Sequence, residues 1–186
     1  MSLLDIRVLG DPILRQETEP VQRVSDELRQ LVADMFATMY AAKGIGLAAP
    51  QVGRTERLAV VDVHDNPLVI INPEVVATEG KSVKGEEGCL SIPDIYGDVE
   101  RMERVHVRAM NLDGQMFEMD ADELFARCLQ HEIDHLHGRL FIDYLSVLKR
   151  RAALSRWAKE KDKYPNLIRR LSAAEVAEHH HRDEEL

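Results

Sequence analysis

The sequence predicts an α+β fold: a single domain of mainly antiparallel strands packed around a central helix that carries an H-E-x-x-H array, plus a C-terminal helix. β-branched runs separated by turn residues fill the middle of the chain, and apolar stripes at helical spacing flank them. At 186 residues, with 45% hydrophobic and 31% charged residues, the chain has the size and composition of one globular domain. We expect residues 1–170 to form this domain and residues 171–186 to form a flexible polar tail.

The first helix is expected to begin at Ser25, whose hydroxyl can cap it. Asp26 and Glu27 follow, and their negative charge favours the positive N-terminal end of a helix. The next residues form an apolar stripe at helical spacing, which consists of Leu28, Leu31, Val32, Met35, Phe36 and Met39. Gly44 is expected to end this helix, and it opens an apolar, glycine-bearing stretch that runs to Gln51.

Strands are predicted wherever β-branched residues gather or apolar and polar residues alternate. The predicted strands cover residues 58–63, 68–71, 75–83, 105–110 and 115–119. Asp65-Asn66-Pro67 separates the first two as a turn, and Gly80 marks a turn or bulge within the third. Asp113-Gly114 can join the last two as a hairpin.

Two further helices follow the strands. The helix with the H-E-x-x-H array is expected to start with a capping box, because Glu123 follows Asp120 by three residues. Gly138 is expected to close this helix as the residue after its C-terminal cap. The last helix spans about Ser146 to Lys163, and Pro165 ends it.

The composition points to a cytoplasmic protein. The start of the chain has no basic segment followed by a long apolar stretch, so no signal peptide is expected. No apolar run approaches the ~20 residues needed to cross a bilayer, and no membrane partner is expected. Two cysteines, Cys89 and Cys128, are too few for a disulfide scaffold and fit a reducing compartment.

The net charge of −9 is unevenly distributed along the chain. The segment from Ser146 to Arg170 contains nine basic and two acidic residues, a balance of +7, which leaves −16 for the remainder. A basic helix on an acidic body can dock on a polyanion, because the local field matters more than the total charge. The alternative is a solvated helix that covers the core with the aliphatic stems of its side chains.

The main signal for chemistry lies at His131, Glu132 and His135, which form the H-E-x-x-H array. Residues four apart lie one above the other on a helix, so both imidazoles can bind one metal ion. Glu132 projects beside them, where its carboxylate can take a proton from a water molecule held by the ion. The alternative interpretation is a solvated helix with a His-Glu face.

A catalytic metal held by two histidines needs a third protein ligand and one open position. Cys128 lies on the same helical stripe, but it is seven residues from His135, about 10.5 Å along the helix axis. Ligands of one tetrahedral ion lie only ~3–4 Å apart, so Cys128 is expected to be a packed core thiol beside the site. Cys89 lies between Gly85 and Pro93 on a separate predicted loop, from which its thiolate can complete the coordination.

Three stretches together resemble the signature motifs of the peptide deformylases. They are Gly-Ile-Gly-Leu-Ala-Ala-Pro-Gln at residues 44–51, Glu-Gly-Cys-Leu-Ser at residues 87–91 and Gln-His-Glu-Ile-Asp-His at residues 130–135. They match the motifs in order and in spacing, and the resemblance runs from about Arg7 to beyond Leu148. The absence of large insertions and the helical C-terminus look like the bacterial type-1 branch.

The resemblance implies removal of formate from the N-formyl-methionine that starts new polypeptides. It implies one divalent metal ion, typically Fe²⁺, with Ni²⁺ or Co²⁺ as active substitutes and Zn²⁺ often poor. It implies that this ion is held by Cys89, His131 and His135. It further implies three residues that act on the substrate: Glu132 as catalytic acid and base, and the side-chain amide of Gln51 and the backbone N–H of Leu90 as donors to the developing oxyanion.

The resemblance also implies a cleft for an N-formyl-methionyl peptide. Ile45 and Gly46 suit a strand-like edge that hydrogen-bonds an extended peptide. The pocket for the methionine side chain is implied at Ile45, Leu124, Arg127, Cys128 and His131, and the alternative is that these are ordinary core neighbours. For the basic segment, the resemblance favours docking on ribosomal RNA near the exit of the nascent chain; no DNA partner is expected.

Two residues depart from the pattern of the family. Arg127 stands where relatives often have an apolar residue, so its stem can line the pocket while its charge must reach solvent or an acid. Tyr96 stands seven residues after the metal cysteine, where several relatives carry an arginine proposed to contact the substrate. Any such role would shift to Arg101 or Arg104, or be absent.

Two other classes of protein fit parts of the pattern. A zinc endopeptidase would take a third ligand downstream, such as Asp143 or Glu160, and would not need Cys89. A non-catalytic structural site would leave Glu132 without a role and would need a fourth protein ligand. Candidates for that ligand are His64, His106 and His137. The tract at residues 179–181, three histidines, can capture adventitious metal, so metal content alone proves little.

Overall fold

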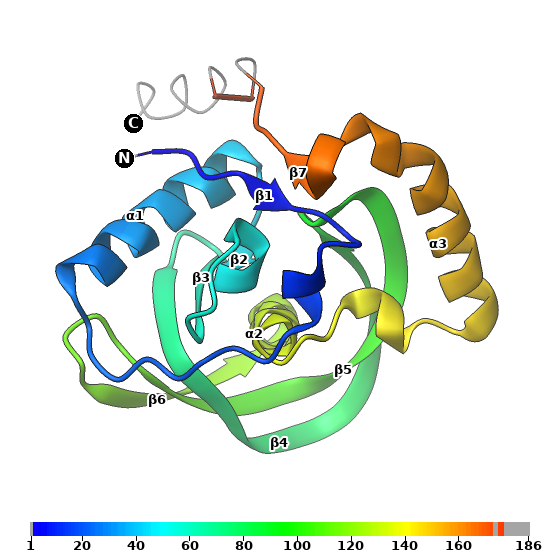
Figure 1. Cartoon of the computed structure of the whole chain (residues 1–186). Coiled ribbons are helices and arrows are strands. Elements are labelled where there is room, and N and C mark those ends of the chain that lie inside the picture. The colour runs from blue at the N-terminus through cyan, green and yellow to red at the C-terminus, as the bar shows by residue number, and fades with distance from the viewer. Residues whose placement is uncertain (1, 173–174, 177–186) are drawn as a thin grey trace.

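The computed structural model of the chain describes residues 2–172 and 175–176. Within them, three α-helices and two antiparallel sheets form one domain, and the predicted α+β fold is confirmed (Figure 1). The helices are α1 (Asp26–Ala41), α2 (Glu123–Leu136) and α3 (Val147–Glu160). The strands are β1 (Ile6–Arg7), β2 (Gly46–Ala48), β3 (Leu58–Asp62), β4 (Pro67–Cys89), β5 (Ile92–Met110), β6 (Met116–Asp122) and β7 (Ile168–Arg169). None of the described helices is long and apolar enough to cross a membrane.

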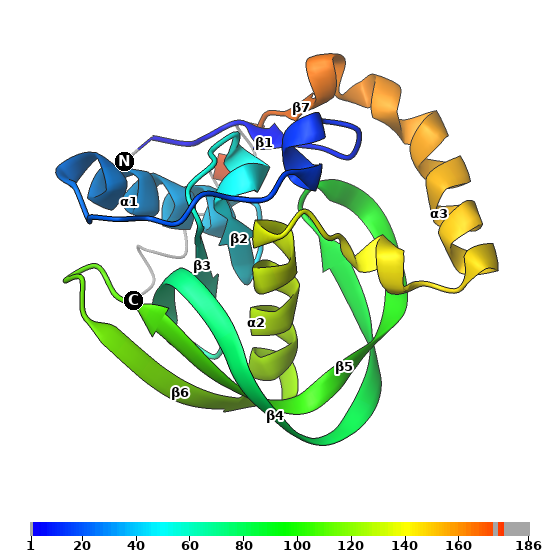
Figure 2. The same ribbon diagram turned by 60° about the horizontal axis from the view of Figure 1, so that its bottom comes forward.

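The larger sheet curves around α2. Its strands run in the order β2-β3-β4-β5-β6, and every neighbouring pair is antiparallel. Figure 1 looks along α2, around which β4, β5 and β6 pass, and Figure 2 shows the same helix lengthwise inside the curve. β4 and β5 are 23 and 19 residues long, and their pairing contains four register shifts. Such bulges bend and twist a strand, which lets two long strands wrap around one helix.

The predicted strands are confirmed as parts of β3, β4, β5 and β6. Gly80 adopts φ 77° at the register shift between Glu79 and Ser82, so it marks a bulge within β4. Gly114 adopts φ 75° in the turn that joins β5 to β6. Both glycines therefore stand where the backbone needs a conformation that other residues rarely adopt.

β3 is buried on both faces, which explains its unbroken apolar run. Ala59 and Val61 join the core cluster around α2, whereas Leu58 and Val60 join the cluster around α1. Successive side chains of a strand point to opposite faces, so the two helices cover opposite sides of the sheet here. The predicted apolar stripe of α1 is confirmed, and Phe36, its half-buried member, packs against the same cluster.

A two-stranded sheet of β1 and β7 joins segments near the two ends of the chain. The N–H of Val8 donates to the carbonyl of Leu167 at 3.0 Å, and the N–H of Leu9 donates to the carbonyl of Ser91 at 2.9 Å. Since Ser91 lies in the turn between β4 and β5, this small sheet braces that turn. Of the predicted tail, only residues 171–172 and 175–176 are described, and the histidine tract at 179–181 lies outside the described residues.

The start of α1 is confirmed, but its end differs from the prediction. The hydroxyl of Ser25 accepts a hydrogen bond from the N–H of Leu28 at 3.1 Å, as a cap does. At the other end, Lys43 rather than Gly44 takes the left-handed conformation, with φ 58°. The N–H of Gly44 then donates to the carbonyl of Met39 at 2.9 Å, which satisfies one of the last carbonyls of the helix.

The start of α2 was predicted wrongly, and its end correctly. Asp120 does not cap the helix, because β6 continues past it; its carboxylate instead lies 2.7 Å from Nδ1 of His106 on β5. Long-range strand pairing has overridden a local capping pattern. Gly138 closes α2 with φ 69°, and the N–H groups of this glycine and the next residue bond to the carbonyls of His135 and Asp134, as in a Schellman motif.

Residues 85–93 do not form the predicted loop. β4 runs to Cys89, and only a two-residue turn separates it from β5. The ring of Tyr96 lies where a Cβ of Gly88 would be. The glycine that suggested a loop therefore allows close approach inside a sheet, which is the other common reason for a glycine within a strand.

Candidate metal centre

His131 and His135 lie one turn apart on α2 and direct the same ring nitrogen toward one place. Their Nε2 atoms are 3.2 Å apart, and the Sγ of Cys89 lies 3.4 Å from the Nε2 of His135. One donor atom from each of these three residues lies within 4.8 Å of the others, a spacing that suits the ligands of one ion. In the described part of the chain, no other group of three such residues has this spacing.

The two cysteines differ in their surroundings. Cys89 reaches the histidines from the end of β4, on a separate element from α2. Cys128 is buried in the core, as predicted, and its Sγ lies 3.5 Å from the carbonyl oxygen of Ile45. Burial raises the pKa of the Cys128 thiol well above its ordinary value, so this thiol stays protonated. Metals bind the thiolate, which makes Cys128 a poor ligand.

A buried carboxylate, Glu87, orients His131. Its Oε1 lies 2.8 Å from the Nδ1 of His131, which leaves the Nε2 of that ring to face the cluster. Metal-binding histidines commonly donate their second N–H in this way. Glu87 was not among the residues predicted from the sequence. Its spacing of two residues from Cys89 becomes a signal only once residues 67–89 are known to form a strand, because such residues then point to the same face.

Glu87 belongs to a buried group of charges. Arg101 donates its Nε and Nη2 to the two carboxylate oxygens of Glu87, both at 2.9 Å, and its Nη1 to Asp134 at 2.5 Å. Arg127 adds a bond from Nη1 to Glu87 at 2.8 Å. Burial raises the pKa of Glu87, but hydrogen bonds to His131 and Arg101 outweigh it and lower the pKa to about 2. The carboxylate is therefore charged at neutral pH.

The pKa values of the two histidines move in opposite directions. Burial lowers the pKa of His131, but hydrogen bonds to Cys89 and Glu87 outweigh it and raise the pKa to about 10. Burial and the positive charge of His131 lower the pKa of His135 well below its ordinary value. One sulfur and two nitrogens are donors that transition-metal ions prefer, so the residues present fit a divalent ion of that kind.

Glu132 lies next to the two histidines on α2 and is only 4% exposed. Its Oε2 is buried and has no hydrogen-bond partner among the described residues. Burial raises the pKa of Glu132 to about 7. Its carboxyl group packs against Gly46, where a Cβ would overlap with it. A carboxyl group that gains and loses a proton near neutral pH suits general acid–base chemistry.

Gln51 directs its amide nitrogen toward the same cluster. It lies in a short 3₁₀ turn, Ala49–Val52, that follows β2. Its Oε1 accepts a hydrogen bond from the N–H of Ala48 at 2.9 Å, which fixes the orientation of the amide. Its Nε2 therefore faces the other way, 3.1 Å from the hydroxyl of Ser91 and 3.5 Å from the Sγ of Cys89.

A cleft of about 700 Å³ opens onto the cluster. Ten of the eleven predicted site residues line it: Ile45, Gly46, Gln51, Cys89, Leu90, Leu124, Arg127, Cys128, His131 and Glu132. The eleventh, His135, is 1% exposed and completes the cluster from inside the protein. β2, an edge strand of the larger sheet, supplies Gly46 to the wall of this cleft.

The charge of Arg127 reaches an acid, as the sequence required of a charged residue at this position. Its guanidinium turns to Glu87 and also donates to the backbone carbonyls of Val83 and Val99, at 2.7 and 2.8 Å. The hydrogen-bonding groups of Arg127 therefore link α2 to β4 and β5.

Neither Arg101 nor Arg104 takes a place in the lining of the cleft. Arg101 is 5% exposed and its guanidinium is occupied by Glu87 and Asp134. Tyr96 lines the cleft and is 63% exposed. Neither Arg101 nor Arg104 is therefore placed to contact a substrate in the cleft, which was the role considered for them in place of Tyr96.

The ligands that the two rival classes require lie elsewhere. Asp143 is paired with Arg15 at 2.6 Å, and Glu160 is paired with Lys163. No histidine other than His131 and His135 joins the cluster within the described residues, which leaves out His64, His106 and His137. The geometry therefore supports neither a downstream third ligand nor a closed four-ligand site.

Comparison with known proteins adds an independent line of evidence. A family model described as polypeptide deformylase matches residues 3–151. The chain is 49% identical over 180 residues to a peptide deformylase of Acinetobacter baumannii (strain SDF), covering 95% of this chain and 98% of that protein. It resembles the crystal structure of a peptide deformylase from Legionella pneumophila, with a TM-score of 0.83, 45% identity and coverage of 87% and 96%. A Synechococcus elongatus peptide deformylase in complex with actinonin gives a TM-score of 0.81, 47% identity and coverage of 83% and 88%.

Proposed function

The chain belongs to the polypeptide deformylase family, enzymes that remove the N-formyl group from nascent polypeptides, and we propose that Cys89, His131 and His135 carry this hydrolysis. The reaction adds water across the formyl amide bond and releases formate and a free α-amine. One observation carries the proposal: at a cleft, a thiol and two imidazoles converge beside a buried carboxyl oxygen that has no partner among residues 2–172 and 175–176.

The family depends on a metal ion, and Cys89, His131 and His135 are the residues that would hold it. When bound, the ion would supply a Lewis acid and lower the pKa of water. Fe²⁺ is the proposed ion in the cell, and Ni²⁺, Co²⁺ and Zn²⁺ suit the same sulfur and nitrogen donors. The spacing and the chemical nature of the donor atoms, one sulfur and two nitrogens, support this assignment.

Glu132 acts as the general base and then as the general acid. It takes a proton from the attacking water and returns it to the nitrogen of the leaving amine. Its position in the lining of the cleft, its unpartnered Oε2 and its raised pKa support both steps. Gly46 gives this carboxyl group room, because it carries no Cβ.

Two donors stabilise the oxyanion that develops as water attacks the formyl carbon. One is the amide of Gln51, which is held in place by Ala48 and Ser91. The other is the backbone N–H of Leu90, which lies in the turn next to Cys89. Preorganised donors of this kind need no rearrangement as charge appears, and each is typically worth ~10²–10³ in rate.

The peptide binds along β2 as an added strand, because the edge of the sheet at Gly46 lies in the wall of the cleft. Ile45 and Leu124 expose apolar side chains there, 43% and 44% accessible, which suits contact with the methionine side chain. The buried thiol of Cys128, the stem of Arg127 and the ring of His131 complete this proposed pocket.

The decisive experiment measures formate release from a formyl-Met peptide by protein loaded with Fe²⁺ under anaerobic conditions. The acetyl-Met counterpart serves as a matched control substrate, and the free α-amine, which either hydrolysis would release, is measured for both peptides. We expect the free amine from the formyl peptide alone, in equal amount to the formate. Equal hydrolysis of internal peptide bonds, without release of formate, would favour an endopeptidase and contradict the proposal.

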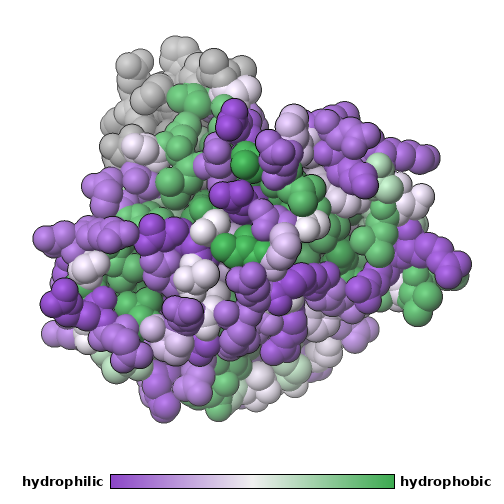
Figure 3. All heavy atoms as spheres, viewed as in Figure 1, coloured by the Kyte–Doolittle hydropathy of each residue, from purple (hydrophilic) through white to green (hydrophobic). Residues whose placement is uncertain are grey.

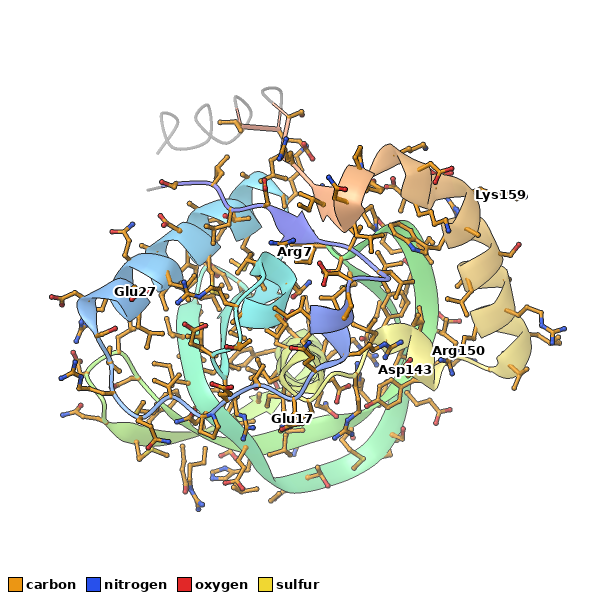
Figure 4. All side chains as sticks on the ribbon, viewed as in Figure 1. Arg7, Glu17, Glu27, Asp143, Arg150 and Lys159 are labelled. Atoms are coloured by element: carbon orange, nitrogen blue, oxygen red, sulfur yellow. The ribbon has the colours of Figure 1, made fainter. Side chains whose placement is uncertain are left out.

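The basic segment Ser146–Arg170 is the proposed contact with ribosomal RNA. The space-filling view shows both hydrophilic and apolar side chains over α3 (Figure 3), where Val147, Leu148 and Leu154 are exposed beside the basic residues and only Trp157 is buried. Lys159 points away from the body, whereas Arg150 lies beside Asp143, 3.6 Å from its carboxylate (Figure 4). Lys149 is likewise paired, with Asp98 at 3.4 Å. This docking places the reaction in the cytoplasm, where new chains emerge from the ribosome.

Reversal of Arg151, Arg156 and Lys159 to glutamate tests this docking. We expect loss of co-sedimentation with ribosomes at low salt, because each phosphate contact contributes through the release of counterions. The matched control reverses three exposed basic residues elsewhere, Arg23, Arg29 and Lys84. Equal loss in both variants would show a nonspecific effect of net charge and would contradict a dedicated docking helix.

A further inference from the structure

Arg169 already binds a carboxylate inside the cleft. Its Nη2 lies 2.9 Å from the Oε1 of Glu175, and both residues line the cleft. The side chain of Arg169 is 17% exposed and that of Glu175 is 32% exposed. The guanidinium is thus mostly covered by protein, and the carboxylate that it holds comes from the same chain, six residues downstream.

The guanidinium of Arg169 lies close to the reacting centre. Its Nη1 is 3.4 Å from the carbonyl oxygen of Leu90, the residue that follows the metal ligand Cys89. An extended chain advances by at most about 3.6 Å per residue, so the side chains of the first residues after a bound formyl-methionine come within reach of Arg169.

Basic and acidic residues of the cleft come from different segments of the chain. Lys43 and Arg170 line the cleft together with Arg169, and they follow α1 and β7. Glu86 and Asp94 also line it, but they belong to β4 and β5. The cleft cations at β7 already have carboxylate partners: Arg170 lies 3.6 Å from Asp5, and Arg169 holds Glu175. Of these two partners only Glu175 lines the cleft, so a carboxylate of the substrate can take its place at Arg169.

We propose that Arg169 is a carboxylate-binding subsite for the substrate. An acidic side chain at the second or third residue of the formyl peptide displaces Glu175 and pairs with the guanidinium. This inference rests on the proposed function and adds a preference among substrates. Glu175 competes for the subsite, so its carboxylate reduces the preference without abolishing it.

The test compares formyl-Met-Ala-Glu and formyl-Met-Glu-Ala with their glutamine counterparts, all amidated at the C-terminus to remove the terminal carboxylate. The measured quantity is the ratio of kcat/KM for each acidic peptide over its neutral partner, because changes in general activity cancel in this ratio. For the wild type we expect a ratio of about two to five for at least one pair, the size typical of a partly exposed ion pair.

Three variants in the cleft and one control outside it locate the effect. Arg169→Gln should bring the ratio to about one, and Arg169→Lys should keep part of the preference. Glu175→Gln should raise the ratio above that of the wild type, because the internal competitor is gone. Arg29→Gln, which removes the same charge from the exposed face of α1, should leave the ratio unchanged. Raising the salt concentration to about 0.5 M should shrink the wild-type ratio.

A wild-type ratio of one for both pairs would overturn the proposal, as would an unchanged ratio in Arg169→Gln. An equal fall in kcat/KM for acidic and neutral peptides, with the ratio preserved, would reduce Arg169 to a support of the turn at Leu90. If even the neutral peptides released no formate, the proposed function would fail. Calorimetric binding of the same four peptides would then decide the subsite by the same comparison of acidic and neutral partners.

Discussion

α2 and α3 are both 14 residues long, yet they handle charge in opposite ways. α2 is enclosed by the sheet, and its Glu132 and Asp134 are 4% and 9% exposed. Asp134 is fixed by Arg101, while one oxygen of Glu132 has no hydrogen-bond partner in the part of the chain that the structure describes. α3 lies on the outside and buries only Trp157, so its basic residues face solvent. The charged side chains of α2 are therefore held in fixed positions beside the metal ligands. Those of α3 instead produce an electrostatic potential at the protein surface.

The largest expected effect separates Cys89, at the end of β4, from Cys128, on α2 itself. Cys89→Ala should lose both the bound metal and activity, because it removes one of three converging donors. Cys128→Ala should keep both, at a modest cost in stability, because this thiol is packed in the core. Metal content should be measured after removal of residues 179–181. Equal metal loss in the two variants would refute the ligand assignment.

The next effect concerns the unpartnered carboxyl group. Glu132→Gln should retain the metal and the fold but lower kcat by about 10²–10⁴, since an amide cannot accept the proton of the attacking water. The measurement pairs steady-state formate release with metal analysis of the same sample. A variant that kept more than about a tenth of the wild-type kcat would rule out Glu132 as the general base.

The third prediction contrasts a buried arginine with an exposed one. Arg101→Met should lower the free energy of unfolding by about 3–5 kcal/mol, because it removes the cation that pairs with Asp134 and leaves buried Glu87 with only Arg127 and His131. Arg151→Met on α3 is the matched control and should change it by less than about 0.5 kcal/mol. Both values come from denaturant titrations. Similar losses at the two positions would contradict the distinction between the helices.

The smallest effect is expected on α3 itself. Reversal of Arg151, Arg156 and Lys159 to glutamate should leave kcat/KM for a short formyl peptide within about twofold of the wild type, because none of the three lines the cleft. It should likewise shift the unfolding free energy by less than about 0.5 kcal/mol per residue. A large loss of activity on the short peptide would mean that α3 supports the site.

Features that depend on neighbours in the sequence were predictable. The stripe of α1, the bulge at Gly80 and the closing turn at Gly138 each follow from periodicity or from one backbone conformation. The convergence of His131 and His135 follows from helical geometry in the same way.

Features that depend on register between distant segments were not predictable. Arg101 meets Glu87 across 14 residues and Asp134 across 33, and both contacts require the pairing of β4 with β5 and the packing of α2. Asp120 shows the same limit in reverse, because its local pattern resembles a cap until β6 pairs with β5. The residue type at one position does not indicate which distant residue it will contact, because that contact depends on the register of the folded sheet.

The sheet of β1 and β7 has a consequence for the order of events during synthesis. The ribosome releases the chain with its N-terminus first. Both strands of the β4–β5 hairpin are available once residue 110 has left the ribosome, and both histidines are available once residue 135 has left it. β1, however, must wait for residues 168–169 before it can pair. Contacts between distant segments also close slowly, so the N-terminal strand is the last to be secured. Arg169 arrives with β7, and a nascent chain therefore completes its metal ligands before it completes the wall of the cleft beside them.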